Sequence, residues 1–163
     1  MLDGFKSTYK WLKINQQKSV NNGVNLKNLT LIEQTCHCGR TNSAGKLLKL
    51  AACCVRYLND FENTPAPDAE SLMRSRYSAF VMKRSDYLLA TWHASTRPAS
   101  VSTDDQTKWL GLEVRRHTVT DADHAEVEFV ARYRISGRGA RIHELSRFVR
   151  DAGRWYYLDG ESR

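Results

Sequence analysis

Four cysteines, Cys36, Cys38, Cys53 and Cys54, lie within nineteen residues and account for every cysteine of the chain. Four thiolates in such a group can close a tetrahedral metal site of the structural, zinc-binding kind. Residues 36–64 contain too few large apolar side chains for a core of their own, so a module here would depend on a metal. We therefore predict a structural zinc ion bound by these four cysteines. The alternative is four free thiols that lie near one another by chance.

The chain offers no apolar segment that suits export or membrane insertion. Residues 1–20 carry Lys and Gln every few positions, which is unlike a secretory signal. The longest apolar run, residues 47–55, is broken by Lys49 and is too short to span a bilayer. We expect a cytoplasmic protein without a membrane partner, in which thiols stay reduced and metal binding is favoured over disulfides.

The net charge of +7 is concentrated toward the N-terminus, where residues 1–35 carry five Lys against Asp3 and Glu33. A basic surface can bind nucleic acid or an anionic protein. The lysines are scattered, however, which favours a solvated surface, and we expect no sequence-specific DNA binding. The composition of residues 1–35, rich in Asn, Gln and Lys, predicts a poorly ordered N-terminal extension.

The cysteine module is predicted to cover residues 36–64. We expect a polar loop at 40–45 and a helical stretch over 47–52 that leads into the double cysteine. The prolines of residues 63–67 predict a stiff linker, after which residues 65–163 form a second, larger domain.

The larger domain begins with helical patterns. Asp68 is a good N-cap, and apolar residues at intervals of three and four predict a helix over 69–81. A second helix is expected over 85–92, and Asp104 or Asp105 could cap a short third one.

The pattern then changes to the alternation of β-strands. Strands are predicted over residues 109–118, 126–134, 143–150 and 154–158, separated by turns. Helices followed by an antiparallel meander indicate an α+β fold with helices packed on one face of a curved sheet. Alternation places Phe129 on the same face as Val127 and Ala131, so we expect Phe129 in the core beneath the first helix.

Specific strings also resemble a known family. Cys36-His37-Cys38-Gly39 followed by Cys53-Cys54 resembles the SEC-C motif, the zinc-binding element named after the SecA C-terminus. Residues 65–160 resemble the YchJ family of uncharacterised bacterial proteins. The matching strings include Leu72-Met73-Arg74-Ser75-Arg76-Tyr77-Ser78-Ala79-Phe80, Asp86-Tyr87-Leu88-Leu89-Ala90-Thr91-Trp92-His93, Trp109-Leu110-Gly111-Leu112, Ser146-Arg147-Phe148 and Arg154-Trp155-Tyr156-Tyr157.

The resemblance implies a small SEC-C zinc module followed by a cone of the nuclear transport factor two-like fold. It also implies a contact of the module with another macromolecule, since the SecA element contacts protein and ribosome. The chain departs from the motif at His37, where Pro is usual, in a longer spacer before Lys46, and at Val55, where Gly is common. In some SEC-C modules a His replaces the last cysteine ligand, but the position of His37 inside Cys-x-Cys argues against that role.

The fold uses a pocket inside its cone in other proteins, so polar and aromatic residues of the larger domain are candidates to line one. These candidates are Arg74, Tyr77, Trp92, His93, Glu128, Arg132 and Glu144. Arg76, on the same helix as Arg74 and Tyr77, could also line the mouth of the cone. The alternative is that Tyr77 belongs to the core, that the helix arginines lie on the surface or pair with Glu128 or Glu144, and that the strand charges pair across the sheet. A base role for His93 would need an acid partner, which the sequence does not identify.

Two functions follow from these observations. The first is a non-enzymatic adaptor whose SEC-C module docks on a protein or ribonucleoprotein partner. The second is a small-molecule-binding protein or an enzyme that uses the cone pocket, with zinc purely structural. A deep pocket with an acid–base pair would favour the second function, and a closed or aromatic-filled cone would favour the first.

Overall fold

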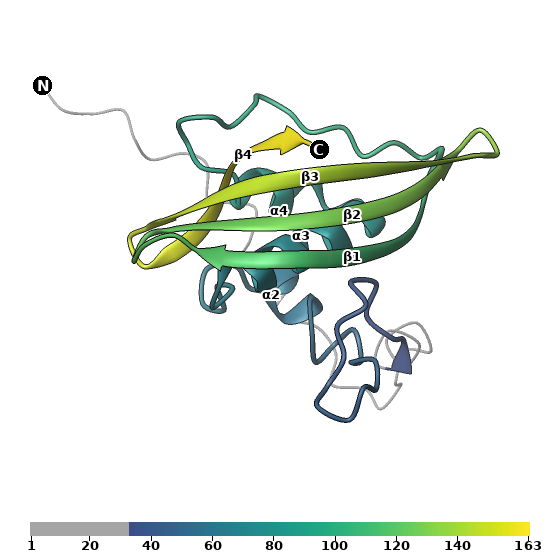
Figure 1. Ribbon diagram of the computed structural model, residues 1–163, viewed down its shortest axis with the longest axis horizontal. Coiled ribbons are helices and arrows are strands. Elements are labelled where there is room, and N and C mark those ends of the chain that lie inside the picture. Colours follow the sequence, from purple (N-terminus) through teal and green to yellow (C-terminus); the bar gives the residue numbers. More distant parts are fainter. Residues whose placement is uncertain (1–32) are drawn as a thin grey trace, which may run out of the picture.

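The structure is a computed structural model that describes residues 33–163 (Figure 1). Its helices are α2 (Val55–Asn59), α3 (Ala69–Val81) and α4 (Ser85–Ala90), and its strands are β1 (Thr107–Val119), β2 (His124–Ile135), β3 (Arg138–Asp151) and β4 (Arg154–Ser162). The prediction for residues 1–35 falls almost entirely outside the described residues. Within residues 33–163, no helix is long and apolar enough to cross a membrane.

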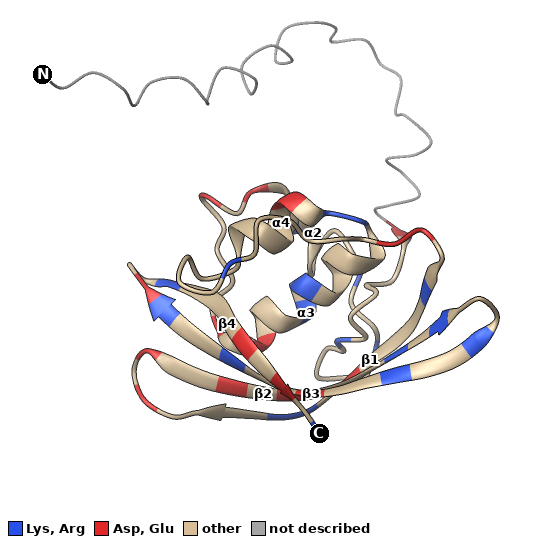
Figure 2. Ribbon diagram, turned by 90° about the horizontal axis from the view of Figure 1, so that it is seen from above, with Lys and Arg blue, Asp and Glu red and all other residues tan. Residues whose placement is uncertain are grey.

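The four strands form one antiparallel meander in the order β1-β2-β3-β4. Its register shifts twice between β1 and β2 and once between β3 and β4. Such bulges increase local twist and bend a strand. The sheet accordingly curves, and Figure 2 shows α3 lying inside the curve. The predicted α+β fold, with helices on one face of a curved antiparallel sheet, is confirmed.

Strand alternation separates a buried inner face from an outer face. On β2, Val127, Phe129 and Ala131 are buried in the core, whereas Glu128 and Arg132 belong to the opposite face. Phe129 is 6% exposed, as predicted from its position on the apolar face. The inner face of the sheet and the apolar face of α3 therefore enclose the core of the cone.

Helix α3 has the bounds that its apolar spacing predicts. The Asp68 side chain accepts a hydrogen bond from the backbone N–H of Ser71 at 2.6 Å, which satisfies one of the free donors of the first turn. Lys83, with φ of 57°, follows the end of the helix in the left-handed region. Side-chain capping and the turn after Met82 thus define both ends of α3.

Two other helix predictions need correction. Helix α4 ends at Ala90 rather than Trp92. Trp92 instead forms a β-bridge to Tyr157 of β4, and the His93 N–H donates to the Tyr157 carbonyl at 2.8 Å. No helix follows Asp104, whose side chain instead accepts from the N–H of Gln106 in a turn just before β1.

The expected helix over residues 47–52 is also absent. Residues 35–41 and 47–49 pair instead as a short antiparallel hairpin, with bridges Thr35–Lys49 and Thr41–Leu47. The Cys36 N–H donates to the Leu48 carbonyl at 2.8 Å. Cross-strand pairing therefore overrides the local helix propensity, and the helix of this segment, α2, begins only after Cys54.

Candidate metal centre and cone cavity

The four cysteines converge at one buried point, although they come from the two ends of the segment. Their sulfur atoms all lie within 4.8 Å of one another. The Cys38 and Cys53 sulfurs are 3.6 Å apart, and those of Cys53 and Cys54 are 3.9 Å apart. These distances are far beyond the roughly 2.05 Å of a disulfide, and all four thiols are free.

The donor set and its dimensions fit a tetrahedral metal site. Metal–thiolate bonds of about 2.3 Å give a tetrahedron whose sulfur–sulfur edges measure about 3.8 Å. The observed separations of 3.6 and 3.9 Å bracket that edge. With four sulfur ligands the tetrahedron is closed, which is the arrangement of structural rather than catalytic sites. The four cysteines could therefore hold one metal ion.

Without a cation, the four thiols could not all ionise together. Hydrogen bonds from Cys38, Cys53 and Cys54 lower the pKa of Cys36. Proximity to Cys36 raises the pKa of Cys53 and of Cys54, because each further thiolate would be buried beside an existing negative charge. A divalent cation would compensate this charge, which is a further reason why the cluster suits a metal.

A turn in the first hairpin strand brings Cys36 and Cys38 to the same side. The Gly39 N–H donates to the Cys36 carbonyl at 3.2 Å, and Gly39 has φ of +69°, a conformation that residues with a side chain seldom adopt. After the second hairpin strand, the Cys53 N–H donates to the Leu50 carbonyl at 3.2 Å, so that Cys53 and Cys54 follow a tight turn.

The cysteine segment is fastened to α3 by charged and polar contacts. Glu70 of α3 accepts from Arg74 at 2.7 Å and from Arg40 at 3.3 Å, and Arg40 also donates to Ser71 at 2.9 Å. Burial opposes ionisation of Glu70, but hydrogen bonds and charge from the two arginines outweigh it and lower the pKa of Glu70. Arg74 also donates to the Cys38 carbonyl at 2.8 Å.

His37 lies outside the ligand set. Its Nε2 atom is hydrogen-bonded to the Gln34 side chain at 3.1 Å, and the group of clustered ligand atoms contains only the four sulfurs. The Cys36 sulfur instead has the Ser78 hydroxyl of α3 at 3.8 Å. Cys36, one of the candidate metal ligands, therefore lies against the helix that also bounds the cone.

A cavity of about 430 Å³ lies between α3 and the inner face of the sheet. This volume falls within the range of small-molecule sites in proteins. Most of its wall is aromatic or aliphatic. The lining residues are Met73, Arg76, Tyr77, Phe80, Trp92, Thr107, Trp109, Phe129, Ala131, Tyr133, Ile135, Ile142, Glu144, Ser146 and Tyr157.

Arg76 brings a positive charge into this wall and is only 4% exposed. Its Nη1 atom donates to the Leu88 carbonyl at 2.7 Å and to the Thr91 hydroxyl at 2.8 Å. The guanidinium lies over the rings of Tyr157 and Trp92, at 4.5 and 5.2 Å from their centres. Burial lowers the pKa of Arg76 to about 10, which still leaves the side chain charged at neutral pH.

Glu144 supplies the negative charge of the wall. Its Oε1 atom accepts from the Ser146 hydroxyl at 2.6 Å and from the Tyr157 hydroxyl at 3.3 Å. Gly160 of β4 makes room for this carboxylate, because a Cβ atom there would overlap it. Arg76 and Glu144 form no ion pair with each other, and Tyr157 contacts both of them.

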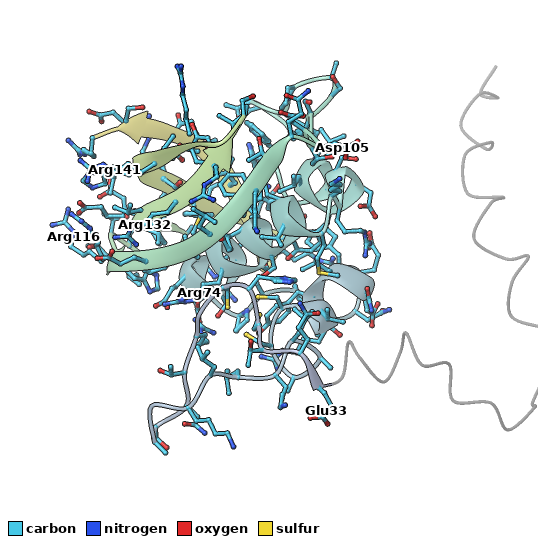
Figure 3. All side chains as sticks on the ribbon, turned by 90° about the vertical axis from the view of Figure 1, so that its right-hand side faces the viewer. Glu33, Arg74, Asp105, Arg116, Arg132 and Arg141 are labelled. Atoms are coloured by element: carbon cyan, nitrogen blue, oxygen red, sulfur yellow. The ribbon has the colours of Figure 1, made fainter. Side chains whose placement is uncertain are left out.

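Of the seven residues suggested for a pocket, the structure brings Tyr77, Trp92 and Glu144 to the cavity. Arg74 and His93 lie elsewhere. Arg74 points toward the cysteine segment (Figure 3), where it donates to the Cys38 carbonyl.

The remaining suggested residues are also outside the cavity. His93 follows α4, is hydrogen-bonded to Ser95 at 2.6 Å and does not line the wall. Glu128 and Arg132 lie on the outer face of the sheet, as alternation from the buried Phe129 requires, and Figure 3 shows Arg132 on the side away from the helices. They pair across strands, Glu128 with His143 at 2.9 Å and Arg132 with Glu113 at 2.8 Å.

Arg76, suggested beside Arg74 and Tyr77 for the mouth of the cone, lines the cavity. The sequence contains a signal for this position, because Arg76 lies four residues after Leu72 and four before Phe80, on the same helical stripe as these apolar residues. A charged residue within an apolar stripe lies either at the edge of the core or, less often, inside it with polar partners. Arg76 is only 4% exposed and therefore lies inside the core.

Comparisons with known proteins agree with this architecture. A family model described as the middle, NTF2-like domain of YchJ matches residues 68–160. A UPF0225 protein of Polaromonas sp. strain JS666 is 66% identical over 129 residues, which cover 78% of this chain and 93% of that protein. A UPF0225 protein of Polaromonas naphthalenivorans is 63% identical over 132 residues, which cover 77% of this chain and 96% of the relative.

Two solved structures are similar over most of the chain. A crystal structure of a SEC-C motif containing protein from Psychrobacter arcticus has a TM-score of 0.67 and 33% identity, over 79% of this chain and 82% of that one. A solution structure of a SEC-C motif containing protein from Rhodopseudomonas palustris has a TM-score of 0.67 and 31% identity, over 80% and 99% of the two chains. The resemblance seen in the sequence is thus confirmed, and the chain belongs to the YchJ-like family, with an NTF2-like domain at residues 68–160.

Proposed function

We propose that the protein binds a small molecule in the cone cavity and that a structural zinc ion at the four cysteines stabilises the fold. The observation that carries the proposal is the 430 Å³ cavity, whose mostly apolar wall contains the buried Arg76. A well-formed apolar cavity with a few convergent polar groups is the usual form of a ligand site. Tyr77, Trp92, Arg76 and Glu144 are the residues proposed to contact the ligand.

We propose binding without turnover. Glu144 is the one carboxylate among the described lining residues, and no His, Cys or Lys lines the wall to act beside it as a second proton donor or as a nucleophile. His93 is bonded to Ser95 outside the wall. The closed sulfur tetrahedron supports a structural role for zinc, because four protein ligands leave no position for a reacting water.

The test is binding of the neutral fluorophore prodan to the zinc-loaded protein. We expect saturable binding at one site and its loss in Ala131→Phe, since Ala131 is 2% exposed and lines the cavity. Ala122→Phe, at an exposed position of the turn between β1 and β2 and away from the cavity wall, is the matched control and should bind as the wild type does. Absence of saturable binding, or equal binding by Ala131→Phe, would overturn the proposal.

Docking of the cysteine module on a protein or ribonucleoprotein partner is the second candidate. One side of the cysteine module packs against α3, so a partner would contact the turn formed by residues 42–47. Leu47 in this turn is an apolar side chain that is 46% exposed. A pull-down from native lysate, with and without a chelator, tests this function. A partner retained by the wild type and lost with both chelator and Leu47→Asp would support docking, and equal retention in all samples would contradict it.

A further inference from the structure

Arg76 is a fixed positive charge that the described protein satisfies only in part. Its Nη1 atom has two acceptors, the Leu88 carbonyl and the Thr91 hydroxyl, but no described residue accepts from Nε or Nη2. Nor does any described carboxylate form an ion pair with it. Glu144 acts on Arg76 only from beyond ion-pair distance. A buried charge without a directly paired counter-ion is costly, and a site that keeps one is suited to an anion. Arg76 lines the cavity, so an anion in the cavity can reach it.

The surroundings of Arg76 select the type of anion. The rings of Tyr157 and Trp92 flank its guanidinium at 4.5 and 5.2 Å and hold it in one orientation. A guanidinium presents a planar fork of donors that matches the two oxygens of a carboxylate. Arg76 is the one positive side chain among the described lining residues, and a single positive charge suits one negative charge better than the multiple charge of a phosphate.

The walls select the body of the ligand. Trp109 stands edge-on to Tyr77 at 5.6 Å and is tilted against Phe80 and Tyr133 at 5.7 and 5.6 Å. These rings line one continuous cavity with Phe129. Aromatic groups gain most from packing against other rings, edge to face or offset. A volume of about 430 Å³ accommodates one small ring system with a short side chain.

Glu144 adds a negative charge to the cavity wall, opposite in sign to the charge of Arg76. Its Oε1 atom is taken by Ser146 and Tyr157, whereas Oε2 has no hydrogen-bond donor among the described residues. A ligand carboxylate would be repelled from this end of the wall, but a hydroxyl group could donate to it. The two charged residues therefore orient a ligand that has an acid at one end and a donor at the other.

We infer that the cone cavity takes a small aromatic carboxylic acid, with its carboxylate paired to Arg76 and a ring hydroxyl directed to Glu144. The inference rests on the small-molecule binding proposed above and names the chemical class of the ligand.

The experiment compares acids with their neutral amides on the zinc-loaded full chain. Benzoate, phenylacetate and 4-hydroxyphenylacetate are each titrated by calorimetry beside the corresponding primary amide, and each is also tested for displacement of prodan. Because a hydrogen-bonded ion pair is lost in the amide, we expect the best acid to bind roughly tenfold or more tightly than its amide. We also expect 4-hydroxyphenylacetate to bind more tightly than phenylacetate.

Two variants assign these preferences to residues. Arg76→Met keeps an apolar side chain of similar length, and it should abolish the preference for acid over amide while prodan still binds. Glu144→Gln should reduce the advantage of the ring hydroxyl and leave the preference for acids in place. The wild-type comparison decides the matter on its own if Arg76→Met fails to fold.

The outcomes separate this inference from the proposed function. If every amide binds as tightly as its acid while prodan is displaced, the cavity is a ligand site but not an acid site, and the inference is overturned. An unchanged acid preference in folded Arg76→Met would also overturn it. If neither acids nor amides bind and prodan does not bind either, the proposed function fails together with the inference.

Discussion

The cysteine site and the cone cavity lie against different faces of α3, and they differ in how completely their polar groups are satisfied. At the cysteine site Arg74 is bonded to both Glu70 and the Cys38 carbonyl, and four sulfurs lie close enough together to hold one metal ion. In the cavity Arg76, two residues away, keeps unused donors beside an open volume. A polar network whose groups are all hydrogen-bonded stabilises a fold, whereas a network with unused donors can bind a ligand.

The largest expected effect comes from opening the sulfur tetrahedron. Cys38 is fully buried, and Cys38→Ser should reduce bound zinc from one equivalent to well below one and unfold the cysteine segment. Thiolate zinc sites contribute on the order of 10–16 kcal/mol in small peptides. Metal analysis and thermal unfolding measure the result, with the exposed Ser43→Ala as the control. A Cys38→Ser protein that retained one equivalent of zinc would contradict the four-ligand site.

Separating the two regions is the next test. We predict that residues 65–163 fold without metal, because most of the buried core lies between α3 and the sheet and comes from these residues, although the cysteines and α2 extend the same core. The fragment should unfold cooperatively at a midpoint that a chelator leaves unchanged, whereas the chelator should lower that of the full chain. Loss of cooperative unfolding in the fragment would mean that the boundary between the two parts is misplaced.

Truncating the core beneath α3 should have an intermediate effect. Phe129→Ala should lower the free energy of unfolding by about 3 kcal/mol, at the low end for a buried Phe because one side of the ring already borders the cavity. Arg134→Ala is the control on the same strand, since Arg134 is exposed on the outer face and should cost less. Denaturant unfolding of both variants gives the comparison, and an equal loss would argue against the assigned inner face.

The smallest change in the free energy of unfolding is expected for Arg76, although this side chain is almost fully buried. Arg74→Met should cost about 1–3 kcal/mol, because it leaves Glu70 and the Cys38 carbonyl with fewer partners. Arg76→Met should change stability by only about 1 kcal/mol in either direction, since the lost hydrogen bonds are offset by removal of a buried, unpaired charge. Equilibrium unfolding decides between them. A larger loss in Arg76→Met would mean that the charge of Arg76 is compensated within the protein.

Local sequence patterns predicted helix α3 and the inner and outer faces of the sheet. The apolar spacing and the Asp68 cap define α3, and the alternation around Phe129 defines the two faces of β2. The cysteine cluster was also predictable, because its chemistry needs only residue type and proximity in the chain. The predicted helix over residues 47–52 failed because pairing with residues 35–41 is a non-local interaction that outweighs propensity.

The cavity could be predicted only in part. Tyr77, Trp92 and Glu144 line it, but the assignment of Glu128 and Arg132 to a pocket ignored that alternation puts both residues opposite Phe129. Arg76 was suggested for the mouth of the cone, and its place on the apolar stripe of α3 agrees with its burial. Its unused donors, however, depend on how α4 and β4 pack around it, which local sequence does not reveal.

The most direct test of the central claim observes both regions at once. Zinc-loaded, isotope-labelled protein is titrated with 4-hydroxyphenylacetate, and chemical-shift changes are mapped onto the chain. We predict that the Arg76 Nε–H and the indole N–H groups of Trp92 and Trp109 shift and saturate together, while the amides of residues 36–54 stay in place. Saturable shifts confined to residues 36–54, or none in the cone, would contradict the account.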